Sequence, residues 1–344
     1  MRQPIDLNTI SDETLLHTRI RDLPISIRGT WLEECIAKLY EELKEKEIRF
    51  SPQCYLADEW LTPDQEPVVG IPFFLAHPAL MRLEKQMMLD VEGGTKPWCL
   101  KLLRHETGHA LNYAYRLFIR KHWQKLFGRF HQDYPDTYRF RPYSRSFVRH
   151  LEDYYAQYHP DEDFAETFAV WLDPESDWHN QYKGWKAMDK LNYVDTLMKS
   201  LRNKEPLVPR GRKYWQSSRI TATLERYYKK KRHSYAEDFH DFHDVNLKRI
   251  FSDAPEECAG VMAAYAVLRK YRKNIINTVS SMTGEKKYIL DDLLAALINR
   301  CRDLRLVIPD SEPLAMVKIT AYVTTLMMNY MYTGRLRGRH EKKA

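Results

Sequence analysis

The chain has 344 residues, of which 44% are hydrophobic and 29% charged, and its formal net charge is +7. These values exclude a chain that is mainly disordered and favour a globular protein with one large core or two modest ones. The positive excess is mild, and a basic run such as 229–232 is more typical of a solvated face than of a nucleic-acid site, so nucleic acid is a disfavoured partner.

Neither the first 24 residues nor any later stretch contains the uncharged apolar run of a signal peptide or a membrane-spanning helix. The five cysteines are odd in number, far apart and without a CxxC pair, which argues against a disulfide framework or a zinc ribbon. We therefore expect a cytoplasmic protein with no membrane partner, whose cysteines are small buried side chains.

The first predicted element is an amphipathic helix over 30–48, where apolar residues recur at helical spacing. Residues 47–80 combine β-favouring side chains with repeated prolines, which predicts a small sheet with edge strands. The stretch from Val68 to Leu75 could pair with the backbone of a bound peptide as an added strand.

Two helices are predicted in the middle of the chain. The first runs from Pro97 to about Lys125, and the second from about 160 to 173, where Pro160 and three successive acids mark its first turn. A connector rich in tyrosine and arginine, over 131–150, lies between them.

Long helical patterns dominate beyond about residue 190, and the loop 203–213, with two prolines and a glycine, is the best candidate linker. We therefore expect an α+β protein that is mainly α, with a first domain over 1–200 that contains the small sheet and a helical C-terminal domain over 201–344. The helical domain is a candidate surface for a protein partner.

The stretch "LLRHETGHALNY", residues 102–113, places His105 and His109 four positions apart on a predicted helix. Residues at this spacing share one helix face, so both rings can reach a single ion at about 2.0–2.1 Å. Glu106 lies one step round, outside the coordination sphere but close enough to act as general base on a water, as the HExxH arrangement requires. The alternative is that the two histidines are simply exposed opposite the apolar stripe. Gly108 inside the helix predicts that another segment packs close to the backbone there.

A third protein ligand is expected, because catalytic zinc usually keeps three side chains and one water. In "DEDFAETFAVW", Glu162 and Glu166 flank an apolar stripe, whereas solvated acids are normally placed opposite it, as Asp163 is. At about 100° per residue Glu162 lies nearer the centre of the stripe than Glu166, so both stay candidates with Glu162 the better placed.

"HETGH" followed by "EDFAETFA" resembles the bacterial zinc-binding metallopeptidases of the gluzincin type and, locally, the catalytic domain of anthrax lethal factor. The resemblance covers about residues 70–175 and implies a zincin-like domain. It implies that Glu162 binds Zn²⁺ and that Glu166 supports a ligand from outside the coordination sphere. It also implies that Tyr155, seven residues before the ligand glutamate, donates to the oxyanion of a tetrahedral intermediate. Packing of its ring under the helix is the alternative for Tyr155.

The sequence thus predicts a zinc-dependent metallopeptidase that hydrolyses peptide bonds in a peptide or protein substrate. One competing hypothesis is a helical protein- or nucleic-acid-binding protein whose zinc site is vestigial or structural, and another is a non-peptidase hydrolase that uses the same metal site. A second histidine pair, His240 and His243, is more typical of a solvated helix face than of a metal site.

Overall fold

The computed structural model describes residues 5–88, 91–134, 141, 144–151, 154–232, 243–254, 262–309 and 311–333. These residues are mainly helical with a small amount of strand, which confirms the prediction of an α+β chain that is mainly α. Contacts divide the chain into two compact units, the first made of most residues up to Glu225 and the second of the residues from Arg226 together with two short earlier stretches, 87–90 and 136–138.

The predicted linker 203–213 lies within the first unit, so the division falls further along the chain than residue 200. Backbone hydrogen bonds tie this segment to the unit at two places: Asn203 N–H donates to the carbonyl of Glu47, and Val208 N–H donates to the carbonyl of Ala114, each at 2.9 Å. A loop rich in proline and glycine is therefore a structural part of the unit rather than a connection between units.

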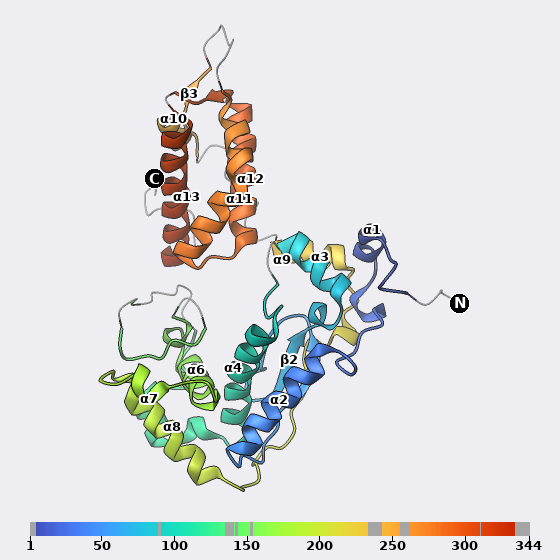
Figure 1. Cartoon of the computed structure of the whole chain (residues 1–344), viewed down its shortest axis with the longest axis vertical. Helices are drawn as coiled ribbons and strands as arrows, with labels where there is room; N and C mark the ends of the chain where they lie inside the picture. Colours follow the sequence, from blue (N-terminus) through green and yellow to red (C-terminus); the bar gives the residue numbers. More distant parts are fainter. Residues whose placement is uncertain are drawn as a thin grey trace, which may run out of the picture. The chain divides into compact units, whose positions relative to one another are not determined.

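The sheet of the first unit has two parallel strands, β1 (Gln53–Ala57) and β2 (Val68–Pro72), as Figure 1 shows for β2 beside α2. Every residue of β2 is buried. Leu61 forms an antiparallel bridge with Gly70 on the edge of β2 that faces away from β1. The small sheet is confirmed. Leu61 already bonds to the outer edge of β2 at Gly70, and Phe73–Ala76 form a 3-10 turn instead of strand, so Val68 to Leu75 does not offer a continuous free edge to a bound peptide.

The central helix of the first unit is α4 (Lys96–Ala114), which carries both histidines. Every residue from Leu102 to its end is buried, because α2 (Trp31–Glu45), β2 and α6 (Pro160–Leu172) pack against it. Figure 1 shows α4 and α6 side by side. The predicted helices over 30–48 and 160–173 are confirmed. The helix predicted to reach Lys125 ends at Ala114, because Arg116 turns the chain with a φ of 50°.

Short elements complete the first unit. Its other helices are α1 (Asp12–Leu16), α3 (Pro78–Met88), α5 (Lys121–Phe127), α7 (Trp178–Gln181) and α8 (Ala187–Leu201), and its 3-10 turns are η1 (Ile20–Asp22), η2 (Phe73–Ala76), η3 (Leu117–Ile119), η4 (Tyr155–Gln157) and η5 (Ser217–Arg219). Helix α9 (Leu224–Arg232) spans the division between the units.

Helices α4 and α6 cross at Gly108. A Cβ atom placed on Gly108 would lie 2.7 Å from the Cα and 3.0 Å from the carbonyl oxygen of Ala165, both backbone atoms of α6. The prediction that a segment packs closely against Gly108 is confirmed. Glycine is needed at this position because a side chain would force the two helices apart.

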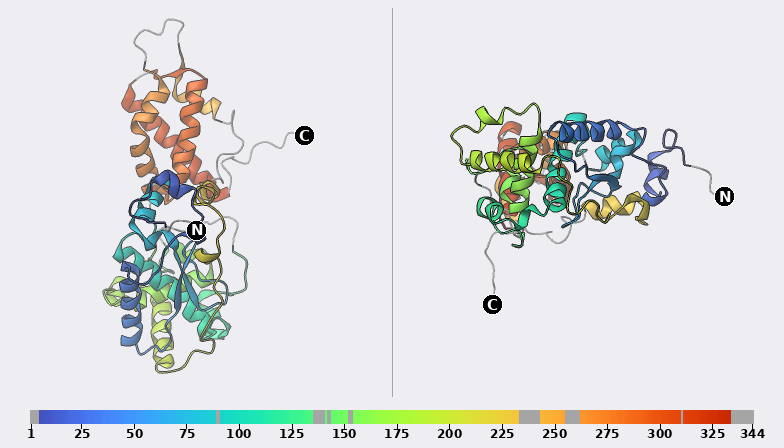
Figure 2. Two further views of the ribbon diagram at one scale, coloured as in Figure 1. Left: turned by 90° about the vertical axis from the view of Figure 1, so that its right-hand side faces the viewer. Right: turned by 90° about the horizontal axis from the view of Figure 1, so that it is seen from below.

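The second unit is a helical bundle of α11 (Ala264–Thr283), α12 (Lys287–Asp303) and α13 (Glu312–Thr333), which lie side by side in Figures 1 and 2. The shorter α10 (Asp244–Ile250) and an antiparallel pair of two-residue strands, β3 (Ser252–Asp253) and β4 (Leu306–Val307), complete it. Leucine and isoleucine side chains from these helices form one continuous core. The long helical patterns of the sequence are thus confirmed as packed helices.

Polar contacts and surface charge also mark the second unit. Arg300 on α12 makes two hydrogen bonds of 2.7 Å to the carboxylate of Asp244, and His243 is buried with its Nδ1 2.8 Å from the hydroxyl of Tyr322. His243 is therefore buried and not on a solvated face as predicted, while His240 lies outside the described residues.

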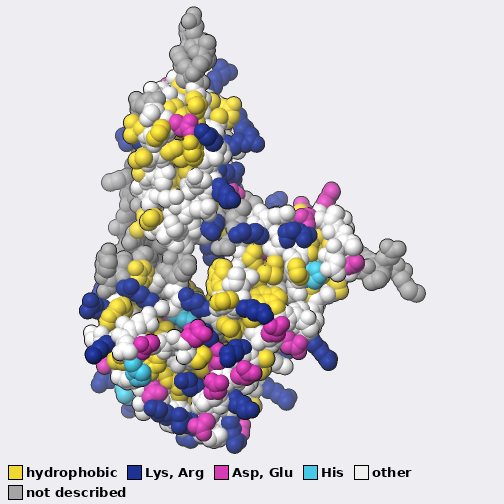
Figure 3. Space-filling model, viewed as in Figure 1, with side chains coloured by type: hydrophobic (Ala, Val, Ile, Leu, Met, Phe, Trp, Pro, Cys, Tyr) yellow, Lys and Arg dark blue, Asp and Glu magenta, His cyan; other side chains and the backbone are white. Residues whose placement is uncertain are grey.

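Lys and Arg side chains gather along one edge of this unit in Figure 3. Among the helices described, none has the length and apolar character that a bilayer crossing requires.

Candidate metal centre

Helices α4 and α6 bring three predicted ligands together. The Oε2 atom of Glu162 lies 3.1 Å from Nε2 of His105 and 3.1 Å from Nε2 of His109, and the two Nε2 atoms are 3.2 Å apart. The three residues are 6%, 3% and 6% exposed in that order, so the hypothesis that the histidines are merely exposed is wrong. Within the described part of the chain, this buried group is the cluster that could hold a metal ion.

The far nitrogen of each imidazole is bonded to a carboxylate. Nδ1 of His105 lies 2.8 Å from Oε1 of Glu166, and Nδ1 of His109 lies 2.8 Å from Oδ2 of Asp161. A neutral imidazole that donates from Nδ1 carries its lone pair on Nε2, so both lone pairs are directed at Glu162. Hydrogen bonds of this kind orient metal-binding histidines and raise their basicity.

Glu166 lies outside the cluster and is itself held in place. Its Oε2 accepts hydrogen bonds from the backbone N–H groups of His150, at 3.2 Å, and Leu151, at 2.8 Å. The two candidate glutamates therefore occupy different places: Glu162 faces both Nε2 atoms, whereas Glu166 contacts the Nδ1 side of His105. This is the arrangement that the helical-wheel placement and the resemblance imply.

Asp161 is a site residue that the sequence did not reveal. Besides His109, it accepts hydrogen bonds from Nδ2 of Asn112 at 2.7 Å and from the hydroxyl of Tyr113 at 2.5 Å. An acid in the first turn of a helix is usually explained by the helix dipole, which concealed this role. Its position directly before Glu162 was the available signal.

The donor set fits a divalent cation. Three acceptor atoms converge without a donor between them when both imidazoles are neutral, an arrangement that is costly in a buried site unless a positive charge is present. Ligand atoms at about 2.0–2.1 Å from a tetrahedral ion are about 3.3 Å apart. The separations of 3.1 and 3.2 Å in the cluster match this value within a few tenths of an ångström.

The pKa values of the clustered side chains also favour a positive charge at this place. Burial by itself lowers the pKa of His105, but its hydrogen bonds to Glu162 and Glu166 outweigh burial and raise that pKa to about 9. The pKa of His109 is likewise raised, against burial, by Asp161 and Glu162, and the histidines together hold the pKa of Glu162 low although burial favours its neutral form. Positive charge is therefore stabilised at the Nε2 atoms, where a cation would compete with protons.

Glu106 is buried next to the ligands, with 8% of its surface exposed. Burial raises the pKa of its carboxyl, and the charges of His105 and His109 oppose the shift. Its backbone carbonyl accepts a hydrogen bond of 3.0 Å from the hydroxyl of Thr62, which anchors this turn of α4 to the loop after β1. The Glu106 carboxyl is thus influenced by the charges of both histidines but is not one of the group of three.

Two tyrosines border the cluster. The ring of Tyr155, at the start of η4, lies with its centroid 5.6 Å from that of His105, and the pKa of its phenol is raised by burial and by the charges of Glu162 and Glu106. Tyr134, which the sequence placed in a mere connector, donates a hydrogen bond of 3.1 Å from its hydroxyl to Oε1 of Glu162. The hydroxyl of Tyr134 and the ring of Tyr155 thus approach the cluster from two segments outside α4 and α6.

The sequence predicts that Asp163 is a solvated acid, but the structure shows otherwise. It is not solvated: it is 2% exposed, and its Oδ2 lies 2.5 Å from Nζ of Lys190 on α8. Burial raises the pKa of this carboxyl to about 7, although Lys190 opposes the shift. The ion pair links α8 to α6, a contact that the pattern of apolar residues did not indicate.

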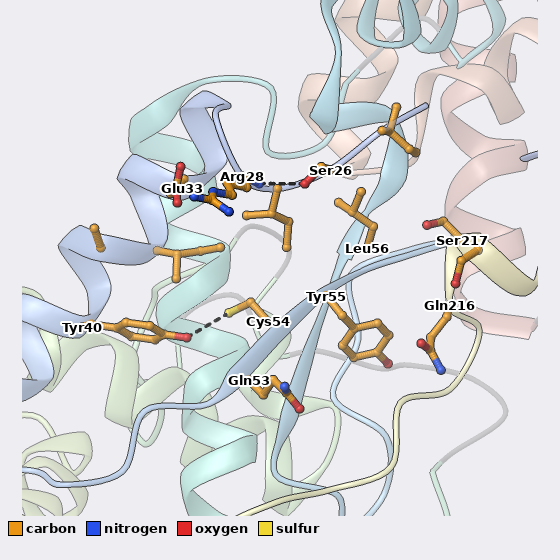
Figure 4. Close-up of a pocket in the computed structure, with 15 residues that line it drawn as sticks. Ser26, Arg28, Glu33, Tyr40, Gln53, Cys54, Tyr55, Leu56, Gln216 and Ser217 are labelled. Atoms are coloured by element: carbon orange, nitrogen blue, oxygen red, sulfur yellow. Dashed lines mark hydrogen bonds between the residues drawn. The ribbon is translucent and has the colours of Figure 1, made fainter. Parts of the chain in front are cut away.

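A separate cavity of about 680 Å³ lies in the first unit and contains none of the cluster residues. Figure 4 shows Tyr40 of α2 pointing toward Cys54 of β1, with its hydroxyl 3.9 Å from the sulfur, while Gln216 and Ser217 close the other side. Apolar side chains (Ile25, Ile27, Ile36 and Leu56) and polar ones (Ser26, Arg28, Glu33 and Gln53) both line it. The cavity is therefore distinct from the metal centre.

No family model, curated protein or solved structure matches the chain.

Proposed function

We propose that the chain is a zinc-dependent metallopeptidase whose first unit is a zincin-like domain. His105, His109 and Glu162 would hold the ion, and Glu166 and Asp161 would orient the two imidazoles. Zinc bound there would polarise the scissile carbonyl of a peptide or protein substrate and acidify the attacking water. The observation that carries the proposal is the buried triangle of Nε2, Nε2 and Oε2 atoms at 3.1–3.2 Å.

The residues around the ligands supply the remaining roles. Glu106 would accept the proton of the attacking water and pass it to the leaving amine. The phenol of Tyr155 would donate a hydrogen bond to the oxyanion that develops on the carbonyl, and losing one such donor typically costs about 100- to 1,000-fold in rate. Two observations support these roles: the charges of both histidines act on the carboxyl of Glu106, and the ring centroid of Tyr155 lies 5.6 Å from that of His105.

The number of ligands favours catalysis over a purely structural site. Structural zinc is almost always held by four protein side chains, whereas catalytic zinc keeps one position for water or substrate. The described residues place three donors in the cluster. This difference speaks against the alternative of a binding protein with a structural zinc site.

Metal analysis combined with a hydrolysis assay tests the proposal. Purified full-length chain should contain about one zinc ion, and it should cleave a mixture of fluorescence-quenched peptides. Glu106→Gln should retain the zinc and lose hydrolysis by at least about 100-fold, since it removes the proton acceptor but no ligand. Glu41→Gln, at an exposed position on α2, is the matched control and should leave both unchanged.

Three outcomes would contradict the proposal. A wild-type chain that binds no divalent metal would remove its basis. A chain that binds zinc but cleaves no peptide would favour the structural alternative, and equal hydrolysis with and without the Glu106→Gln substitution would show that the site does not act through this residue.

A further inference from the structure

The two oxygens of the Glu162 carboxylate have different surroundings. Oε2 lies 3.1 Å from the Nε2 atoms of both His105 and His109, whereas Oε1 accepts a hydrogen bond of 3.1 Å from the hydroxyl of Tyr134. A carboxylate can bind a metal through one oxygen or through both. The phenol of Tyr134 therefore donates to Oε1, the oxygen that would also have to contact the metal if the carboxylate bound through both of its oxygens.

Tyr134 is fixed relative to α6 by His159. The two rings are stacked, with centroids 4.0 Å apart and planes at 13°. His159 caps α6: its Nδ1 accepts from the backbone N–H of Asp161 at 3.2 Å, and its Nε2 lies 2.9 Å from the carbonyl of Gln132, two residues before Tyr134. The tyrosine and the carboxylate that it contacts are thus attached to the same helix start.

We propose that Tyr134 is a positioning residue of the metal centre, which keeps Glu162 bound through Oε2 alone by donating to Oε1. The proposal rests on the metal site proposed above. Without the hydroxyl, Oε1 can turn toward the ion and add a fifth ligand atom, or the carboxylate can lose its orientation. In either case the site is less well matched to a four-coordinate ion with one exchangeable position.

Tyr134→Phe removes the hydroxyl and keeps the ring that stacks on His159. We expect its zinc affinity, measured by competition with a chromophoric chelator, to fall about 10-fold, the low end for lost outer hydrogen bonds, because 46% of Tyr134 is exposed. With Co²⁺ in place of zinc, the visible absorption should weaken, because five-coordinate Co²⁺ absorbs less than four-coordinate Co²⁺. Tyr115→Phe is the matched control, since its hydroxyl bonds the carbonyl of Lys204 at 2.8 Å.

The results separate this inference from the proposed function. If the wild type binds zinc and Tyr134→Phe matches it in affinity and in the Co²⁺ spectrum, the positioning role is overturned while the metal site stands. If Tyr134→Leu weakens zinc binding and Tyr134→Phe does not, zinc binding depends on the stacked ring and not on the hydroxyl. This result would also overturn the positioning role. A wild type that binds neither ion overturns the proposed function itself. Circular dichroism of each variant checks that the fold is retained.

Discussion

The crossing of α4 and α6 at Gly108 allows a single substitution to test how the proposed metal site is held together. Gly108→Ala adds one methyl group, which would lie 2.7 Å from Cα and 3.0 Å from the carbonyl oxygen of Ala165. Carbon atoms in contact are normally about 3.5–4.0 Å apart. The two helices must therefore separate by roughly 1 Å, because the obstructing atoms are backbone and cannot rotate away.

Two free-energy effects oppose each other. Alanine is favoured over glycine in a helix interior by about 1 kcal/mol, while overpacking a core costs about 1–3 kcal/mol. The variant should therefore be less stable than the wild type by up to about 2 kcal/mol. Metal binding should also be weakened, because His105 and His109 lie on one helix and Glu162 on the other. A shift of about 1 Å exceeds the tolerance of about 0.2 Å in metal–ligand distances, so zinc affinity should fall by at least about 10-fold.

Urea unfolding and a zinc competition titration measure the two effects. Asn192→Ala, on the exposed side of α8, is a control for helix propensity alone and should stabilise the chain slightly without changing zinc binding. Adding Ala165→Gly to the variant removes one obstructing methyl group but leaves the backbone contacts, so it should restore the affinity only in part. A Gly108→Ala protein that is about 1 kcal/mol more stable and binds zinc normally would show that the two helices do not have to separate.

Replacing Glu162 with Ala should lower the zinc content after dialysis more than replacing Glu166 with Ala, because only Glu162 faces both Nε2 atoms; equal losses would contradict the ligand assignment. Arg104→Met should cost about 3–5 kcal/mol in urea unfolding, because Glu42, 1% exposed, would lose the two hydrogen bonds that Arg104 donates and would stay buried without a partner for them; a loss below about 1 kcal/mol would argue against a buried pair. Burial lowers the pKa of His243 from 6.5 to about 4, so its contribution to stability is complete above pH 6.5 and is lost as the pH falls toward 4. His243→Asn should therefore lose less stability than the wild type over that range, and parallel curves would contradict this.

Local patterns were sufficient for much of the secondary structure and for the first half of the site. The helical spacing of apolar residues predicts α2, α6 and the long helices of the second unit, because a helix that packs on one side must repeat its apolar residues about every 3.6 positions. The spacing of His105 and His109 likewise predicts a shared face. Both patterns depend only on short runs of neighbouring residues, so they can be recognised without knowing which segments pack around them.

Other features depend on contacts between distant segments. The edge of β2 is covered because the chain returns at Leu61, and Asp163 is buried because Lys190 approaches from α8. Asp161 and Tyr134 show no pattern of their own in the sequence, since each acts through a hydrogen bond to a residue that folding brings near. Their roles are visible only once α6 and the segment before it are in place.

The amino-acid pattern identifies the side chains that could bind a metal, but the way in which they meet depends on how α4 and α6 pack. Helix α6 runs antiparallel to α4, so Glu166 meets His105 and Asp161 meets His109, with Glu162 between the two histidines. This register follows from the close contact of Gly108 with Ala165, a distance that no periodicity encodes. Helix patterns specify faces, but only packing against a particular neighbour selects which atom of each face points at which partner.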